Sequence, residues 1–236
     1  MRKQYIYSDQ LSLWGERECI GFGNENFYVK EIDKQISNEI IIKNHYSKKV
    51  AGFATTYIYL GVFENDILFG TLQYGFAMNP ASAKNIVDGT GIYEHLELNR
   101  MWLSDEIKTK YPESQAISMS ISFIKKKYPK IKWIQSFADE RCGGFGIVYQ
   151  ACSFSYYGEH KADFYSLDGE YIHKIALTHH ADKRPLYEKI RARKDELQKE
   201  TFRQFRYIKF LDSQWKKKCL LKEQPYPKHY NDEKNR

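Results

Sequence analysis

The chain has 236 residues, of which 42% are apolar, so it is long enough for one sizeable domain, or for a domain plus an extension. No apolar run approaches the roughly 18 residues of a membrane-spanning helix, and the polar start MRKQYIYSDQ shows no signal peptide. The four cysteines form no C-x-x-C pair, which favours a reducing compartment. We therefore expect a cytoplasmic protein with no membrane partner and no cysteine-bound metal.

The formal net charge of +7 is distributed unevenly along the chain. Residues 182–236 hold 17 Lys and Arg against 9 Asp and Glu, whereas residues 1–181 are nearly balanced. A basic segment of this kind indicates a polyanionic partner such as nucleic acid. A solvated basic tail explains the same charges equally well.

Apolar periodicity and turn residues indicate an alternation of strands and helices. The clearest signals are two hairpins, one around the turn at 64–66 and one around Asp168-Gly169, a pair that suits a type I′ turn. In chain order we expect a strand at 26–32, a helix at 33–46, strands at 57–63 and 67–75, a short helix at 81–88, a strand at 95–103, a helix at 114–128, a strand at 131–138, a short helix near 146–152 and a hairpin at 164–177.

Two of these helices carry apolar stripes that should face a sheet. Ile36, Ile40 and Ile41 fall on one side of the helix at 33–46. The helix at 114–128 has a stripe of Ile117, Ile121 and Ile124, and Ser114 is its expected N-cap.

The order of elements predicts an α/β (α+β) fold, in which a mixed central sheet is flanked by helices. This order is similar to that of the GNAT family of N-acetyltransferases. We expect residues 1–181 to form the GNAT-like catalytic domain. Residues 182–236 would be a basic C-terminal extension that packs on the domain and contacts nucleic acid; 186–200 should be helical, and 202–211 fits either a helix or a strand.

The segment FADERCGGFG contains the pattern R-x-x-G-x-G at Arg141, Gly144 and Gly146. In GNAT enzymes such a loop follows the fourth strand, and its backbone amides bind pyrophosphate at a helix N-terminus. Here the fourth strand would be 95–103, and the loop after it, SDEIKTKYPE, has no glycine. The match lies one strand too late, so a tight strand-to-helix turn is favoured. Arg141, Gly143, Gly144 and Ser114 remain the candidates for binding a donor.

Several segments together resemble the Mom proteins of Mu-like bacteriophages, from about residue 43 to 227, with the first 40 residues outside the resemblance. The resemblance implies a GNAT-like enzyme that converts the exocyclic amine of adenine in phage DNA to a carbamoylmethyl-amine, which protects the DNA from host restriction. The segments are KNHYSKK (43–49), LQYGFAMNP (72–80), LELNRMWL (96–103), YPKIKWIQSFADERCG (128–143), VYQACSF (148–154) and RYIKFLD (206–212).

The resemblance implies catalytic roles for His45 and Tyr46, in its HYS stretch, and for Tyr149. His45 could act as a general base or contact the substrate, or it could simply cap a helix C-terminus. Tyr149 takes the place of the tyrosine that often protonates the leaving group in GNAT enzymes, while Ser153 replaces the glycine of that helix. Alternatively, Tyr149 is a core aromatic residue with a satisfied hydroxyl.

Two charged residues near apolar strands complete the predicted catalytic set. Arg100 lies among Leu, Met and Trp, so its charge needs a partner, which could be Glu97, Asp139 or a substrate. Asp139 ends a strand, where open sheets bind ligands, although a turn or capping role is the alternative.

The expected partners are DNA and, through the donor, tRNA. An aromatic residue such as Tyr46 or Tyr57 could hold an unstacked adenine. The donor is an activated acyl group, carried by glycyl-tRNA or acyl-CoA. A metal remains possible, but the adjacent His179 and His180 show no ligand spacing. Other functions stay open, namely an acetyl-CoA-dependent N-acetyltransferase acting elsewhere, or a non-catalytic nucleic-acid-binding protein. The expected DNA contacts are Lys48, Tyr57, Arg191, Arg193, Arg203 and Arg206.

Overall fold

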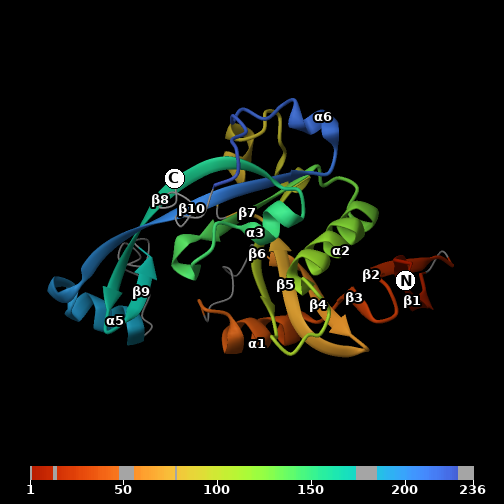
Figure 1. Cartoon of the computed structure of the whole chain (residues 1–236), viewed down its shortest axis with the longest axis horizontal. Coiled ribbons are helices and arrows are strands. Elements are labelled where there is room, and N and C mark those ends of the chain that lie inside the picture. The colour runs from red at the N-terminus through yellow and green to blue at the C-terminus, as the bar shows by residue number, and fades with distance from the viewer. Residues whose placement is uncertain (1, 13–14, 48–55, 78, 174–184, 228–236) are drawn as a thin grey trace, which may run out of the picture.

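A computed structural model describes residues 2–12, 15–47, 56–77, 79–173 and 185–227. Ten strands in these ranges form one sheet in the order β1-β2-β3-β4-β5-β6-β7-β10-β8-β9 (Figure 1). The strands are β1 (Gln4–Leu11), β2 (Arg17–Gly23), β3 (Phe27–Glu31), β4 (Thr56–Glu64), β5 (Ile67–Gly75), β6 (His95–Leu103), β7 (Trp133–Asp139), β8 (Ser155–Leu167), β9 (Glu170–His173) and β10 (Gln198–Phe210).

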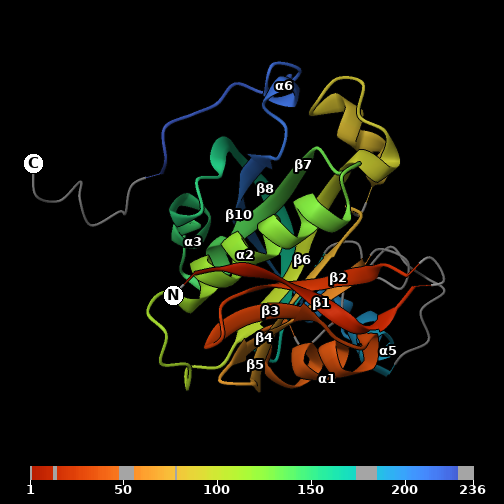
Figure 2. The same ribbon diagram turned by 90° about the vertical axis from the view of Figure 1, so that its right-hand side faces the viewer.

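Helices cover both faces of this mixed sheet, which confirms the predicted fold class. Helix α1 lies against one face and α2 against the other (Figures 1 and 2). The helices are α1 (Lys34–Asn44), α2 (Pro112–Lys127), α3 (Ile147–Ala151), α5 (Pro185–Ala192) and α6 (Ser213–Lys216), with 3₁₀ turns η1 (Pro80–Asn85), η2 (Ile92–Glu94), η3 (Glu140–Cys142) and η4 (Lys194–Glu196).

Strands β6 and β7 are parallel, and the other paired strands are antiparallel. Their parallel pairing begins at His95 opposite Trp133 and ends at Glu97 opposite Gln135. Beyond that point β6 continues against β5 alone, and β7 continues against β10. We call this point of divergence the fork. Such a divergence of parallel strands is a common place for a ligand in an α/β sheet.

Both predicted hairpins are present, and their turns explain why. Asn65 and Asp66 have φ values of 50° and 66°, and Asp168 and Gly169 have φ values of 52° and 80°. Two consecutive residues with positive φ are the signature of a type I′ turn, which Asn, Asp and Gly tolerate best.

The two predicted helix stripes have different outcomes. On α2, the apolar stripe is confirmed, with Ile117 and Ile124 fully buried. On α1, the prediction for Ile36 is wrong, since its side chain is 42% exposed while Ser37 is fully buried. The reason is a polar surface on β5, where Ser37 Oγ lies 2.7 Å from Thr71 Oγ1 and accepts from Gln73 Nε2 at 2.9 Å.

The basic C-terminal region contributes a central strand of the sheet. Strand β10 inserts between β7 and β8 and buries Phe205 and Tyr207 on one face. This strand settles the open alternative for 202–211, and the predicted helix at 186–200 ends already at Ala192. Residues 198–210 of the basic region thus lie inside the sheet.

Candidate active site at the fork

A buried carboxyl–amide pair occupies the fork itself. Gln135, which is 4% exposed, donates from Nε2 to Glu97 Oε2 at 2.9 Å. Burial raises the pKa of Glu97 to about 7, although Gln135 and the nearby Arg100 oppose that shift. A carboxyl group with a pKa near neutrality can both accept and release a proton at physiological pH.

Two arginines surround Glu97 with positive charge. Arg100 and Arg206 both act on Glu97 electrostatically. Arg100 donates from Nη1 to the carbonyl oxygen of Asn99 at 2.6 Å, and the Arg206 guanidinium lies 5.2 Å from the ring centroid of Phe137. Burial lowers the pKa of each guanidinium, but an arginine remains charged at any physiological pH. The fork can therefore stabilise negative charge that develops on a substrate.

His45 lies beside Arg100 at the end of α1 and is almost completely buried. Burial and the charge of Arg100 lower the pKa of His45 to about 4, so its imidazole is neutral. Its Nδ1 accepts the backbone N–H of Ser47 at 3.1 Å, which leaves the ring proton on Nε2. These contacts suit a neutral hydrogen-bond donor better than the predicted general base or a charged helix cap.

Tyr46 connects the end of α1 to the glycine segment. Its ring lies 4.2 Å from that of His45, and its hydroxyl bonds to the side chain of Cys142. Burial, followed by the proximity of Cys142 and Asp139, raises the pKa of Tyr46 above its usual range. Tyr46 is still 59% exposed, so its ring is accessible to a substrate.

Asp139 and Arg141 form a closed pair at the end of β7. Arg141 Nε donates to both carboxylate oxygens, at 3.0 and 3.1 Å, and its Nη2 also contacts Oδ2. The Arg141 guanidinium lies 3.7 Å from the ring centroid of Phe164. The Asp139 carboxylate is therefore engaged by Arg141. Arg141 is likewise held in place, which argues against the predicted donor contact.

The glycine segment is a strand-to-helix turn, as its position one strand late suggested. Gly143 and Gly146 have φ values of 71° and 81°, conformations that favour glycine. A Cβ at Gly146 would lie 2.4 Å from the Tyr207 ring, so this position also needs glycine for space. Gly144 has open space around it.

Tyr149 is buried behind the fork and matches the core-aromatic alternative. Its side chain is 9% exposed, its hydroxyl bonds to Ser136, and its ring lies 5.4 Å from that of Tyr207. Burial raises the pKa of Tyr149 to about 12, so the phenol stays protonated. Ser136 Oγ in turn donates to the carbonyl of Leu98 at 3.4 Å, which links Tyr149 to both strands of the fork.

An internal carboxylate fills the loop between β6 and α2. Glu64, which is 7% exposed, accepts from the backbone N–H groups of Lys108 and Thr109 at 3.0 and 2.8 Å, and from the Thr109 hydroxyl at 2.6 Å. These bonds lower the pKa of Glu64. In a GNAT enzyme this loop would bind pyrophosphate, but here Glu64 already occupies the amides of Lys108 and Thr109. These two amides are therefore not available to the pyrophosphate of a CoA donor.

The start of α2 differs from the prediction as well. The helix begins at Pro112, and its N-cap is Tyr111, with a φ of 54° and no side-chain cap. Ser114 is inside the first turn and donates its hydroxyl to the Tyr111 carbonyl at 3.1 Å. The capping role predicted for Ser114 is wrong, because proline can begin a helix two residues earlier.

The predicted DNA contacts are scattered, and several are already paired. Arg203 donates to Glu140 Oε1 at 2.7 Å, and Arg193 contacts Asp168 at 2.7 Å. Arg206 is half-buried at the fork, Arg191 lies on α5, and Tyr57 is 37% exposed. Lys48 lies outside the described residues.

Glu97 and Gln135 are site residues that sequence reasoning missed. The sequence indicated Glu97 only as a possible ion-pair partner for Arg100. The signal was a carboxylate in the strand HLELNRMWL, between two leucines that are buried. Gln135 gave a weaker signal, as a single amide in an apolar strand.

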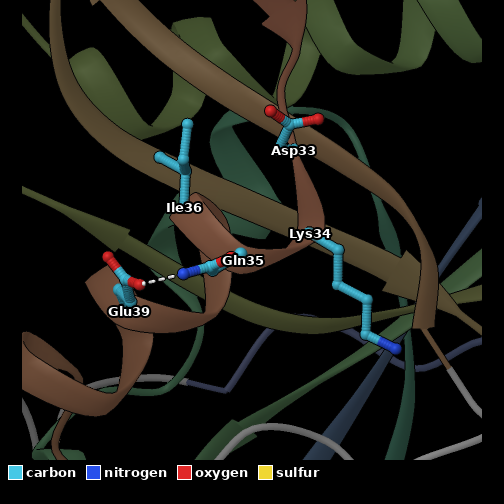
Figure 3. Close-up of a pocket in the computed structure, with 5 residues that line it drawn as sticks. All are labelled: Asp33, Lys34, Gln35, Ile36 and Glu39. Atoms are coloured by element: carbon cyan, nitrogen blue, oxygen red, sulfur yellow. Dashed lines mark hydrogen bonds between the residues drawn. The ribbon is translucent and has the colours of Figure 1, made fainter.

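Other candidate sites are weaker. Figure 3 shows a hollow at the first turn of α1, which is open and polar and holds no residue of the fork. Within the described ranges, no group of three or more His, Cys, Asp or Glu side chains is placed so that it could hold a metal ion. His179 and His180 lie outside those ranges. No described helix is long and apolar enough to cross a membrane.

The mixed sheet, with helices on both faces and one parallel pair that forks, defines an α/β (α+β) protein. The family model of the Mom protein family matches residues 26–228, and the chain belongs to this family. A relative, the methylcarbamoylase mom of Escherichia phage Mu, is 40% identical over 232 residues, which span 96% of this chain and 94% of that protein.

Solved acetyltransferases have a similar arrangement at low sequence identity. The ribosomal-protein-S5-alanine acetyltransferase of Vibrio fischeri is 13% identical, with a TM-score of 0.49 over 83% of this chain and 98% of its own. The yncA acetyltransferase of Salmonella typhimurium, solved with acetyl-CoA, is 10% identical, with a TM-score of 0.47 over 80% of this chain and 95% of its own.

Proposed function

We propose that this protein is a DNA-modifying transferase that converts the exocyclic amine of adenine to a carbamoylmethyl-amine and so protects phage DNA from restriction. The observation that carries the proposal is the near full-length similarity to the methylcarbamoylase of phage Mu. The site at the fork supports it with a carboxyl group of near-neutral pKa between two arginines. The target adenine must leave the base stack, or be single-stranded, for its amine to be reached.

In the proposed first step, the adenine amine attacks the carbonyl carbon of an activated acyl donor. The Glu97 carboxylate accepts a proton from the attacking nitrogen as the N–C bond forms. Arg100 and Arg206 stabilise the negative charge on the carbonyl oxygen. The donor's leaving group departs with the electron pair of its bond to the acyl carbon.

The product's connectivity suggests a glycyl donor. In a carbamoylmethyl-amine the nitrogen on the purine ring is bonded to CH₂, and the carboxamide is at the far end, so plain acetyl transfer cannot produce it. After glycyl transfer, the free glycine amine could attack the ring carbon and form a five-membered spiro intermediate. Cleavage of the bond from that carbon to the original nitrogen then releases that nitrogen as the carboxamide, with no change in oxidation state. Intramolecular attack of this kind benefits from effective molarities of order 10⁵ M.

The loop after β6 supports a donor other than CoA, because Glu64 already occupies the amides of Lys108 and Thr109. Glycyl-tRNA supplies the required activated ester, and the basic region 182–236 suits a second polyanion. We expect CoA to give no protection against thermal unfolding. Clear protection by CoA would instead favour an acyl-CoA donor.

Mass spectrometry of nucleosides tests the proposal. DNA from cells that express the protein should contain the modified adenine, and DNA from cells with Glu97→Gln should not. After feeding with glycine labelled with heavy nitrogen, the label should appear on the nitrogen attached to the purine ring. Label absent from that nitrogen would contradict the glycyl scheme, and unmodified DNA would contradict the function.

A further inference from the structure

A hollow lined by aromatic rings lies away from the fork, near the C-terminal end of α2. Its volume is about 570 Å³. Its rings come from the start of β4, the residue after β5, the 3₁₀ turn η2 and the residue after α2. The wall is completed by Lys127, Pro129, Lys130 and Ile131. We call it the aromatic pocket, and its rings are those of Tyr57, Phe76, Tyr93 and Tyr128.

The rings stand close together, but two of them remain open to solvent. The centroids of Tyr57 and Phe76 lie 5.1 Å apart, and those of Phe76 and Tyr93 lie 5.7 Å apart. Tyr57 is 37% exposed and Tyr93 is 69% exposed. Rings in tilted and edge contact leave faces on which another flat ring can stack.

The charge of the pocket selects the kind of ligand. Among the residues that the structure describes, no carboxylate lines the pocket. Lys127 is neutralised by Glu18 and Glu31, at 2.7 and 2.5 Å, whereas Lys130 is exposed and makes no ion pair within the described residues. An aromatic wall beside one unpaired ammonium group matches a nucleobase with its phosphate.

The pocket and the fork lie on opposite faces of the sheet. Phe76 follows Tyr74 by two residues, and Tyr74 bonds to Ser120 on α2. At the fork, Arg100 is opposite Gln73, which bonds to Ser37 on α1. A base in the pocket is therefore separate from the adenine that reacts.

A short chain of hydrogen bonds connects the two regions. Thr56 Oγ1 donates to Asn99 Oδ1 at 3.2 Å, and Asn99 Nδ2 donates to the Phe76 carbonyl at 3.2 Å. Asn99 also accepts from Arg100 through its carbonyl oxygen. The backbone beside the pocket is thus joined to Arg100 at the fork through Asn99.

We infer that the aromatic pocket binds an unpaired nucleobase of the DNA substrate, a base that flanks the adenine being modified. The inference rests on the proposed function, because it presupposes a DNA substrate. It adds a second binding site that holds the strand while the target base is at the fork. Stacking of this kind tolerates any base, so the pocket supplies affinity more than sequence preference.

Fluorescence of single-stranded oligonucleotides tests the inference. A 2-aminopurine probe one to three positions from the target adenine should be quenched on binding to the full chain. Tyr93→Ala and Tyr57→Leu should each remove the quenching and weaken binding about tenfold. Tyr93→Phe should retain both, because it keeps the ring. Tyr111→Ala is the matched control, since Tyr111 is a 79% exposed tyrosine at the other end of α2.

The outcomes separate the two claims. If the wild-type chain modifies DNA but both pocket variants bind and quench as it does, the pocket inference is overturned and the proposed function stands. If no sample contains modified adenine and the wild-type chain does not bind DNA, the proposed function and the pocket inference both fail. Weakened binding in the variants, with Tyr93→Phe and Tyr111→Ala unaffected, supports the pocket.

Discussion

Two glutamates of the sheet, the buried Glu64 and the half-buried Glu97, experience opposite environments. The loop after β6 gives Glu64 three hydrogen-bond donors, and these lower its pKa. Glu97 receives hydrogen bonds from the side chains of Gln135 and Asn99, but loss of water outweighs them and raises its pKa to about 7. Low exposure alone thus does not make a carboxyl group reactive. The balance between loss of water and hydrogen bonds decides whether the group is fixed as an anion or free to exchange a proton.

The largest expected effect is the loss of the proton acceptor at the fork. Glu97→Gln should lower modification by at least ~10², the scale of a lost acid–base group. Activity of the wild-type chain should rise as pH increases through about 7, as the carboxylate forms. Single-turnover rates across pH measure this, and the same pH profile in Glu97→Gln would contradict the role.

Stability should show the reverse dependence on pH. A raised pKa means that the folded state favours the protonated Glu97, so its contribution is present at low pH and is lost as pH rises through about 7. Relative to Glu97→Gln, the wild-type chain should therefore lose stability between about pH 4.3 and 7. Urea denaturation at several pH values measures the difference.

Removing the neighbouring cation should have nearly as large an effect. Arg100→Ala should lower modification by ~10² or more, because a positioned charge is lost. It should also raise the pKa of His45 from about 4 and shift the activity profile to higher pH, since Arg100 lowers the pKa of both His45 and Glu97. Proton NMR titration of His45 checks the first shift. An unchanged pKa of His45 would show that Arg100 and His45 do not interact.

For Glu64, the carboxylate bound by the loop after β6, we expect an effect on stability without an effect on catalysis. Glu64→Gln should reduce the free energy of unfolding by about 1–3 kcal/mol, because one of its oxygens can no longer accept from the loop. The effect should disappear as pH falls and the wild-type carboxylate is protonated, since its pKa is lowered. Glu113→Gln, an exposed change in the first turn of α2, is the control. Loss of activity per folded molecule would instead connect Glu64 to the reaction.

The smallest effects concern DNA binding. Arg193→Ala should reduce the slope of log affinity against log salt by less than the one unit expected for a phosphate contact, because the guanidinium already pairs with Asp168 and Glu196. Titration at several salt concentrations measures the slope, and the loss of a full unit would contradict this expectation.

Local signals predicted much of the fold. The Asn65-Asp66 and Asp168-Gly169 turns and the isoleucine stripe of α2 each encode a structure within a few residues. Sequence patterns did not predict the edge strand β1 or its neighbour β2, and β1 is mostly exposed and lacks an apolar alternation. The buried face of α1 was misjudged because its surroundings on β5 are polar.

The site was harder to predict than the fold because it depends on pairing between distant segments. Glu97 meets Gln135 only because β6 and β7 pair in parallel for a few residues and then diverge. Nothing within HLELNRMWL specifies that register. Similarly, the closed pair of Asp139 and Arg141 depends on a turn geometry, which the pattern R-x-x-G-x-G suggested only in part.

Strand β10 affects how the protein can be synthesised and dissected. It lies between β7 and β8, which both precede it in the chain, so those strands have open edges until residues 198–210 leave the ribosome. Folding must therefore wait for a late, long-range pairing, which is slow and leaves edges prone to aggregation. A truncation after residue 181 would remove a central strand as well as basic charge. Only point substitutions can separate nucleic-acid binding from assembly of the sheet.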